Sequence, residues 1–154
     1  MSEQGKNTPH SQDARRPPTA LHITLPLPPS INEQYATVNG NRVSTVVARR
    51  FKQQVRDILH TLERQGHIQD ELLNSLRQGY LALFLDFYFA TPLKRDLDGG
   101  LKITQDALCD GLGINDNRVV DIHLSKHIDP LHPHLYVEIE AISDWQFDKE
   151  YVLL

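Results

Sequence analysis

The fold is decided by the stretch Tyr80-Leu-Ala-Leu-Phe-Leu-Asp-Phe-Tyr-Phe-Ala90, the most hydrophobic segment of the chain. It is rich in aromatic residues and contains no glycine or proline, a composition typical of a β-strand. Its nearly continuous apolar character predicts a central strand that is buried on both faces. The odd-numbered residues from Leu81 to Phe89 share one face, and Asp86 lies on the other.

Shorter patterns surround this strand. Alternating apolar residues predict strands at 21–25, 119–124 and 135–142, and Asn39-Gly40 predicts a tight hairpin turn between 35–38 and 42–45. Apolar residues at helical spacing predict helices at 46–65, 69–77 and 98–112. The fold class is therefore α+β, a single domain with a mixed β-sheet of about four to five strands and two main helices. We expect the 98–112 helix to carry the edge of the functional site and the 46–65 helix to back the sheet.

Length and composition limit the organisation of the chain. A chain of 154 residues fits one domain. Residues 1–19 lack core-forming side chains, which predicts a disordered N-terminal tail, and residues 143–154 are treated as a C-terminal extension. No apolar run reaches the length of a membrane span and no secretory signal is visible at the N-terminus. The single cysteine, Cys109, excludes an internal disulfide and favours a cytoplasmic location.

The charge is unevenly distributed. The 16 Lys and Arg and 20 Asp and Glu give a net charge of −4, which excludes a protein that coats nucleic acid through bulk positive charge. Residues 1–64 hold 9 basic and 5 acidic residues (net +4), and residues 65–154 hold 7 and 15 (net −8). Each half therefore needs its own explanation.

Carboxylates concentrate between residues 94 and 121. Asp96 and Asp98 are two residues apart, which places both side chains on the same side of an extended segment. Lys102 and Asp106 follow at four-residue intervals along the predicted helix, and Asp116 lies in the turn after it. Clustered carboxylates suit a hard cation such as Mg²⁺ or Mn²⁺, and a nearby lysine suits a phosphate.

Asp96 and Asp98 also have interpretations other than a magnesium site. Asp96 and Asp98 would equally form a solvated loop and helix N-cap, which is the more frequent meaning of an isolated Asp-x-Asp. A calcium-binding loop is excluded, because the required glycine and closing glutamate positions hold Leu101 and Ala107.

Residues 21–141 resemble the RusA family of Holliday junction resolvases. The matching segments are Ile23-Thr24-Leu25-Pro26, Pro28-Pro29-Ser30 with Asn32, Arg95-Asp96-Leu97-Asp98, Lys102, Asp106-Ala107-Leu108, Asp116 with Val119-Val120-Asp121, and Lys126. They occur in the family's order over nearly the whole domain, which is expected to span 20–142. The resemblance is therefore far more specific than Asp-x-Asp alone.

The resemblance implies a Mg²⁺-dependent endonuclease that acts as a homodimer and cuts two opposed strands of four-way junction DNA symmetrically. The family's metal-binding aspartates correspond to Asp96, Asp98 and Asp116, and its essential lysine corresponds to Lys102. This assigns catalytic roles to Asp96, Asp98, Lys102 and Asp116. The cofactor would be Mg²⁺, with Mn²⁺ as an alternative.

The sequence departs from the family at three places. Asp98 is followed by Gly99 where the family usually has asparagine, and the turn after the helix reads Asn115-Asp116 where the family often has two aspartates. The arginine run before the motif is reduced to Lys94-Arg95, so fewer phosphate contacts are expected. Two alternatives therefore stay open: a DNA-binding protein of this fold without catalysis, and a nuclease directed at flaps, forks or duplex DNA.

Several other residues have simpler or complementary interpretations. The predicted DNA-binding residues are Arg42, Arg49, Arg50, Lys52, Arg56, Lys94, Arg95 and Lys126, although a basic helix face is about as often only a solvated surface. His123, His127, His132 and His134 suggest zinc, but i and i+4 lie about 13 Å apart in a strand, so ordinary histidines are expected. Cys109 is interpreted as a packing residue. No P-loop is present in the sequence, so no nucleotide cofactor is expected.

Overall fold

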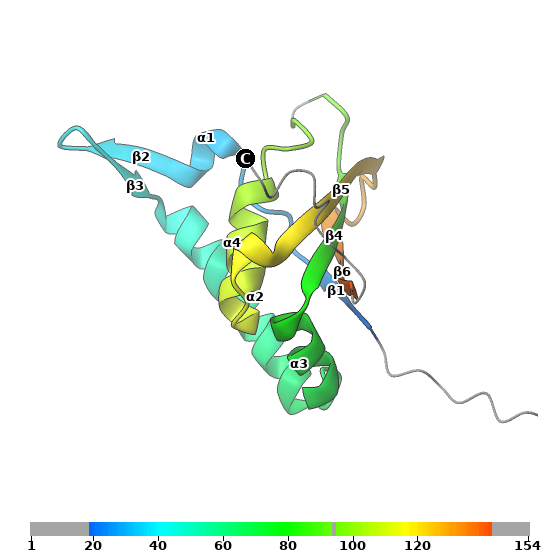
Figure 1. The fold of residues 1–154 in the computed structure, drawn as a ribbon. Coiled ribbons are helices and arrows are strands. Elements are labelled where there is room, and N and C mark those ends of the chain that lie inside the picture. Colours follow the sequence, from blue (N-terminus) through cyan, green and yellow to red (C-terminus); the bar gives the residue numbers. More distant parts are fainter. Residues whose placement is uncertain (1–18, 94, 143–154) are drawn as a thin grey trace, which may run out of the picture.

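The computed structural model describes residues 19–93 and 95–142 (Figure 1). The elements are, in order, β1 (Ala20–Leu25), α1 (Ile31–Gln34), β2 (Tyr35–Val38), β3 (Asn41–Ser44), α2 (Val46–Arg64), α3 (Asp70–Gln78), β4 (Tyr80–Phe89), α4 (Leu101–Leu112), the 3₁₀-helix η1 (Asp116–Arg118), β5 (Val119–Ile128) and β6 (His134–Ile142). The predictions for the tail at 1–18 and the extension at 143–154 lie outside the described residues. No helix within the described ranges is long and apolar enough to cross a membrane.

Four strands form one mixed sheet in the order β1-β6-β4-β5. β4 is antiparallel to β6 and parallel to β5, and β1 pairs antiparallel with β6. The parallel pair requires a long connection, which α4 supplies between β4 and β5. β2 and β3 form a separate two-stranded sheet. The predicted α+β fold with a mixed sheet is confirmed, and α1 and α3 accompany the two long helices.

β4 is the most deeply packed strand, but its two faces are buried to different extents. Its odd-numbered side chains, Leu81 to Phe89, are all nearly inaccessible. On the opposite face Ala82 is buried, but Phe84, Asp86 and Tyr88 are only half-buried, so the predicted burial on both faces is wrong from Phe84 onward. The helices pack against one face of the sheet (Figure 1), and aromatic side chains on the other face stack across strands. The rings of Phe84 and His123 lie 4.6 Å apart, and those of Tyr88 and His134 lie 4.3 Å apart.

The two long helices lie side by side and form the second layer (Figure 1). α2 begins at the N-cap Thr45, whose hydroxyl oxygen accepts a hydrogen bond from the Ala48 amide at 3.1 Å. α2 and α4 approach closely at Gly111, where an added Cβ would meet Leu59 Cδ1 at 2.5 Å. α4 ends at Gly113, whose φ of +68° is in the left-handed region that favours glycine.

Candidate active site

The Asp96-Leu97-Asp98 motif lies in the connection from β4 to α4. The backbone turns over residues 97–100, with the Gly99 amide 3.4 Å from the Asp96 carbonyl oxygen and the Leu101 amide 3.1 Å from that of Asp98. Both aspartate side chains are exposed. The prediction of an extended segment is therefore wrong at Asp98, because the chain must already turn into α4. The N-cap interpretation of these aspartates is also wrong, since the N-cap residue of α4 is Gly100 and no side chain caps the helix there.

Gly100 fixes this turn against the N-terminal segment. A Cβ at this position would meet Pro28 Cγ at 2.4 Å and Phe87 Cε1 at 3.2 Å. Only glycine therefore fits between the proline ring and the end of β4. The close contact explains why a Pro28-Pro29 segment distant in sequence belongs to the same site as the aspartates.

Gln34 provides a second connection between the same two segments. Its Nε2 donates hydrogen bonds to the Pro29 carbonyl oxygen at 2.9 Å and to the Gly99 carbonyl oxygen at 2.8 Å. The side chain is only 1% exposed, and its Oε1 has no partner among the described residues. A buried amide that spans two loops in this way fixes their relative positions.

Two predicted DNA-binding residues hold the other end of the loop. The Lys126 ammonium donates to the carbonyl oxygens of Pro92 and Arg95, both at 2.8 Å. The Arg95 guanidinium donates to the Pro28 carbonyl oxygen and lies over the Phe89 ring at 5.3 Å from its centroid. Burial lowers the pKa of Arg95, and the Glu33 carboxylate opposes that shift. Arg95 and Lys126 thus stabilise the loop through hydrogen bonds to backbone carbonyl oxygens. Their contacts with DNA stay a prediction.

Lys102 joins two carboxylates from different elements. Its Nζ lies 2.7 Å from Asp106 Oδ1, one turn along α4, and 3.3 Å from Asp116 Oδ2 in η1. The hydrogen bond to Asp106, followed by the one to Asp116, raises the pKa of Lys102. The lysine is largely exposed, and exposed ion pairs contribute little stability. These contacts therefore hold the Lys102 ammonium close to two carboxylates and contribute little to the stability of the fold.

Asp116 is positioned by the short helix η1. The Asn115 side chain accepts a hydrogen bond from the Asn117 amide at 3.2 Å and caps this helix. Asn115, one of the departures from the family pattern, therefore orients the segment that carries Asp116. The contact between Lys102 and Asp106 agrees with their predicted spacing of one helical turn, whereas the contact with Asp116 was not predicted.

The donor set fits Mg²⁺ chemically, because exposed carboxylate oxygens are its preferred protein ligands. In this conformation, however, the carboxylates are not gathered into a metal site. Among residues 19–93 and 95–142, no group of three or more His, Cys, Asp or Glu side chains is arranged to hold a metal ion. Asp116 instead pairs with Lys102. A metal held by Asp96, Asp98 and Asp116 would thus require these side chains to rearrange.

The predicted basic surface lies on α2 and the β2–β3 hairpin. Arg42, Arg49, Arg50 and Arg56 are exposed, and Lys52 is half-buried. The Arg49 guanidinium donates to the Ser44 carbonyl oxygen, which ties the hairpin to α2. Lys52 and Asp106 line one small cleft of ≈ 60 Å³, so the basic helix adjoins the carboxylate cluster. Lys94 lies outside the described residues.

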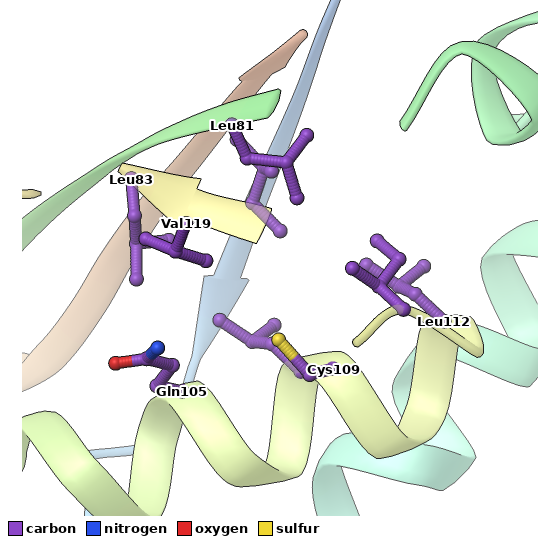
Figure 2. A pocket seen from close by; sticks show the side chains of 9 residues that line it. Leu81, Leu83, Gln105, Cys109, Leu112 and Val119 are labelled. Carbon is purple, nitrogen blue, oxygen red and sulfur yellow. The ribbon is translucent and has the colours of Figure 1, made fainter. Parts of the chain in front are cut away.

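A separate cavity between α4 and the sheet does not form part of this site. Figure 2 shows side chains from β4, α4 and β5 around it, with Cys109 and Leu112 on the helix side. Its volume of ≈ 10 Å³ leaves room for little more than one water molecule. Burial raises the pKa of Cys109 to about 11, so the thiol is protonated at neutral pH. Both observations agree with a packing residue.

Sequence reasoning missed Gln34 as a member of the site. The residue lies just after the matched segment Pro28-Pro29-Ser30-Ile31-Asn32, but no periodicity or spacing distinguishes it. Its importance follows from burial and from its contact with Gly99, 65 residues away. The proline pair beside it was the only available signal.

The comparison with protein families found a match over most of the chain. The family profile described as endodeoxyribonuclease RusA matches residues 26–140 of the 154-residue chain. No curated protein matches the sequence significantly. The matched range includes the Pro28-Pro29 segment, the hairpin, both long helices and every residue of the candidate site.

Proposed function

The chain belongs to the RusA family of endodeoxyribonucleases, and from that membership we propose that it resolves Holliday junctions by Mg²⁺-dependent, paired and symmetric nicking. The family itself implies hydrolysis of DNA within a strand and activity on junction DNA. The metal dependence, the paired cuts and the role of each residue are our proposal for this chain.

The observation that supports the proposal best is the arrangement around Lys102. Its ammonium lies between carboxylates of α4 and η1, at 2.7 Å from Asp106 and 3.3 Å from Asp116. The Asp96–Asp98 turn directly precedes the same helix. Carboxylates for a cation and a lysine for a phosphate thus occur at one end of the β4–α4 connection.

We assign a distinct role to each side chain. Asp96, Asp98 and Asp116 would hold Mg²⁺, which supplies positive charge beside the scissile phosphate when it is bound. Lys102 donates to an oxygen of that phosphate and stabilises its developing negative charge. Asp106 keeps the Lys102 ammonium in place through their 2.7 Å contact. Gln34, Arg95 and Lys126 position the aspartate turn through their backbone contacts.

Paired cutting requires two such sites. A homodimer would present two identical sites related by a two-fold axis, which matches the two-fold symmetry of a four-way junction. The exposed arginines of α2 and the hairpin would contact phosphates and position the DNA without reading its sequence. Binding should therefore weaken steeply as the salt concentration rises.

The test uses a synthetic four-way junction with the wild type, Asp98→Asn and the control Asp70→Asn. Asp70 begins α3, at the opposite end of the molecule from the aspartate turn (Figure 1). We expect Asp98→Asn to bind the junction normally and to lose Mg²⁺-dependent nicking, and Asp70→Asn to cut normally. Undiminished cutting by Asp98→Asn would reject the assignment.

The same assay separates the two alternatives. Binding by the wild type without nicking in Mg²⁺ or Mn²⁺ would identify a non-catalytic DNA-binding protein. Equal cutting of the junction and of linear duplex DNA would identify a nuclease with a different target. Either result would overturn the proposed resolvase activity.

A further inference from the structure

The hairpin of β2 and β3, residues 35–44, extends away from the two-layer body as an arm (Figure 1). Its turn contains Asn39 and Gly40, with φ of +51° and +78°, typical of a tight hairpin turn. Every residue from Tyr35 to Val43 is exposed. An isolated two-stranded hairpin is marginally stable in water, so an exposed arm of this kind calls for an explanation.

The register makes the arm amphipathic. Ala36 pairs with Val43 and Val38 with Asn41, so one face carries three apolar side chains, of which Val38 is 52% and Val43 39% exposed. On the other face the Arg42 guanidinium lies 3.9 Å from the centroid of the Tyr35 ring. Six of the ten large hydrophobic side chains exposed within the described residues fall between Ile31 and Val47. The arm and its base thus carry most of the large hydrophobic side chains that are exposed among the described residues.

The charge around the arm favours a polyanion as its partner. Residues 35–56 contain five basic residues (Arg42, Arg49, Arg50, Lys52, Arg56) and no Asp or Glu. The rest of the chain holds 16 − 5 = 11 basic and 20 acidic residues, a net charge of −9. The positive charge is therefore concentrated where the apolar face is exposed.

The base of the arm adjoins the candidate active site. Tyr35 and Ser44, its first and last residues, line the same cleft as Lys52 and Asp106. Gln34, which directly precedes the arm, donates to the Gly99 carbonyl oxygen beside Asp98. DNA held at the aspartate turn would therefore lie within reach of the arm.

A second copy of the chain is a poorer occupant of this face. A stable protein interface buries about 800 Å² on each partner, far more than three small side chains present. An arm-to-arm contact across a two-fold axis would also bring two sets of five positive charges together. Both arguments favour DNA over the arm of a second copy as the occupant of this apolar face.

We propose that the apolar face of the β2–β3 arm, formed by Ala36, Val38 and Val43, inserts between base pairs at the branch point of DNA. Proteins that kink DNA use apolar side chains in this way, with basic residues on the flanking phosphates. Bases at a branch point are less stacked than those in a duplex, so insertion favours branched DNA. The inference rests on the proposed function and extends it to the basis of structural selectivity.

The test is the double variant Val38→Thr with Val43→Thr, which keeps side-chain shape and β-propensity but removes the apolar face. Binding is measured in EDTA, so catalysis does not enter, on a four-way junction with 2-aminopurine at the branch point and on a matched duplex. In the arm variant we expect the affinity for the junction to fall about tenfold and the affinity for the duplex to change less than twofold. The change in 2-aminopurine fluorescence that the wild type causes on binding should be lost. The control, Ile122→Thr with Leu131→Thr, alters two exposed apolar side chains outside the arm and its base and should bind like the wild type.

Each outcome has a defined meaning. Unchanged junction affinity and an unchanged 2-aminopurine signal in the arm variant would reject insertion and leave the proposed function intact. A change in oligomeric state on sedimentation of the arm variant would reject it in favour of an interface between copies. Failure of the wild type to bind any branched DNA would overturn the proposed function and this inference together.

Discussion

Replacing Gln34 by alanine should weaken both the fold and catalysis, although Gln34 is not expected to touch DNA. Its Nε2 makes hydrogen bonds of 2.9 and 2.8 Å to the carbonyl oxygens of Pro29 and Gly99. The Gly99 carbonyl belongs to the turn that presents Asp96 and Asp98. Without the amide, this turn loses one of its connections to the N-terminal segment.

The size of the effect follows from these contacts. Two lost hydrogen bonds contribute about 2 kcal/mol, and one lost buried methylene adds about 0.8 kcal/mol. Removal of the buried Oε1, which has no hydrogen-bond partner in the part of the chain that the structure describes, offsets this by about 1 kcal/mol. We therefore expect the free energy of unfolding to fall by about 2 kcal/mol. For a domain of this size that corresponds to a decrease in Tm of roughly 6–10 °C.

The assay combines urea unfolding with junction cleavage at a temperature where the variant is fully folded. We expect kcat to fall about 10- to 100-fold, because a small displacement of catalytic groups has effects of this size. Gln53→Ala is the control, since Gln53 is exposed on α2 and its side chain makes hydrogen bonds with Asp57 and Arg56 of the same helix. It should change neither stability nor kcat appreciably.

Two results would refute this reasoning. Unchanged stability of Gln34→Ala would show that the buried amide contacts do not hold the two segments together. A loss of stability with an unchanged kcat would show that the aspartate turn keeps its geometry without Gln34. In that case the residue would have no role in positioning the site.

Further predictions concern Lys102 and Cys109. Lys102→Gln should change the free energy of unfolding by less than about 1 kcal/mol, because the ion pairs of Lys102 are exposed. The same variant should cleave the junction about 100-fold more slowly. A large loss of stability with normal cleavage would contradict the role assigned to Lys102. Burial raises the pKa of Cys109 from 9.0 to about 11, so at pH 8 iodoacetamide should alkylate the native thiol about 100-fold more slowly than the unfolded one, as measured by mass spectrometry. The same shift predicts that stability falls as the pH rises from 9 towards 11, because the unfolded thiol ionises first; equal reactivity of the native and unfolded thiols would contradict it.

Much of the fold could be predicted because local patterns determine it. The helix predicted at 46–65 is α2, Val46–Arg64, and the strand predicted at 80–90 is β4, Tyr80–Phe89. The Asn39-Gly40 turn was equally visible. The extent of burial on the second face of β4 could not be predicted in the same way. Phe84 and Tyr88 look like core residues until their histidine neighbours on other strands are known.

The site could be predicted in composition but less well in geometry. The spacing of Lys102 and Asp106 predicted that they lie one helical turn apart, and the structure shows that they are in contact. The turn at 97–100 was missed because its cause is remote: Gly100 must pack against Pro28, whose position no local pattern reveals. Gln34 was missed for the same reason, because its partners come from two separate loops.

The most direct test of the central claim is a map of the nicks that the wild-type protein makes in a four-way junction labelled on each strand in turn. We predict Mg²⁺-dependent cuts at two symmetry-related positions on opposed strands, and no cuts by Asp98→Asn. The cut positions would then report two identical sites that act on one two-fold substrate. Nicks scattered over all four strands, or an uncut junction that the protein nevertheless binds, would contradict the account.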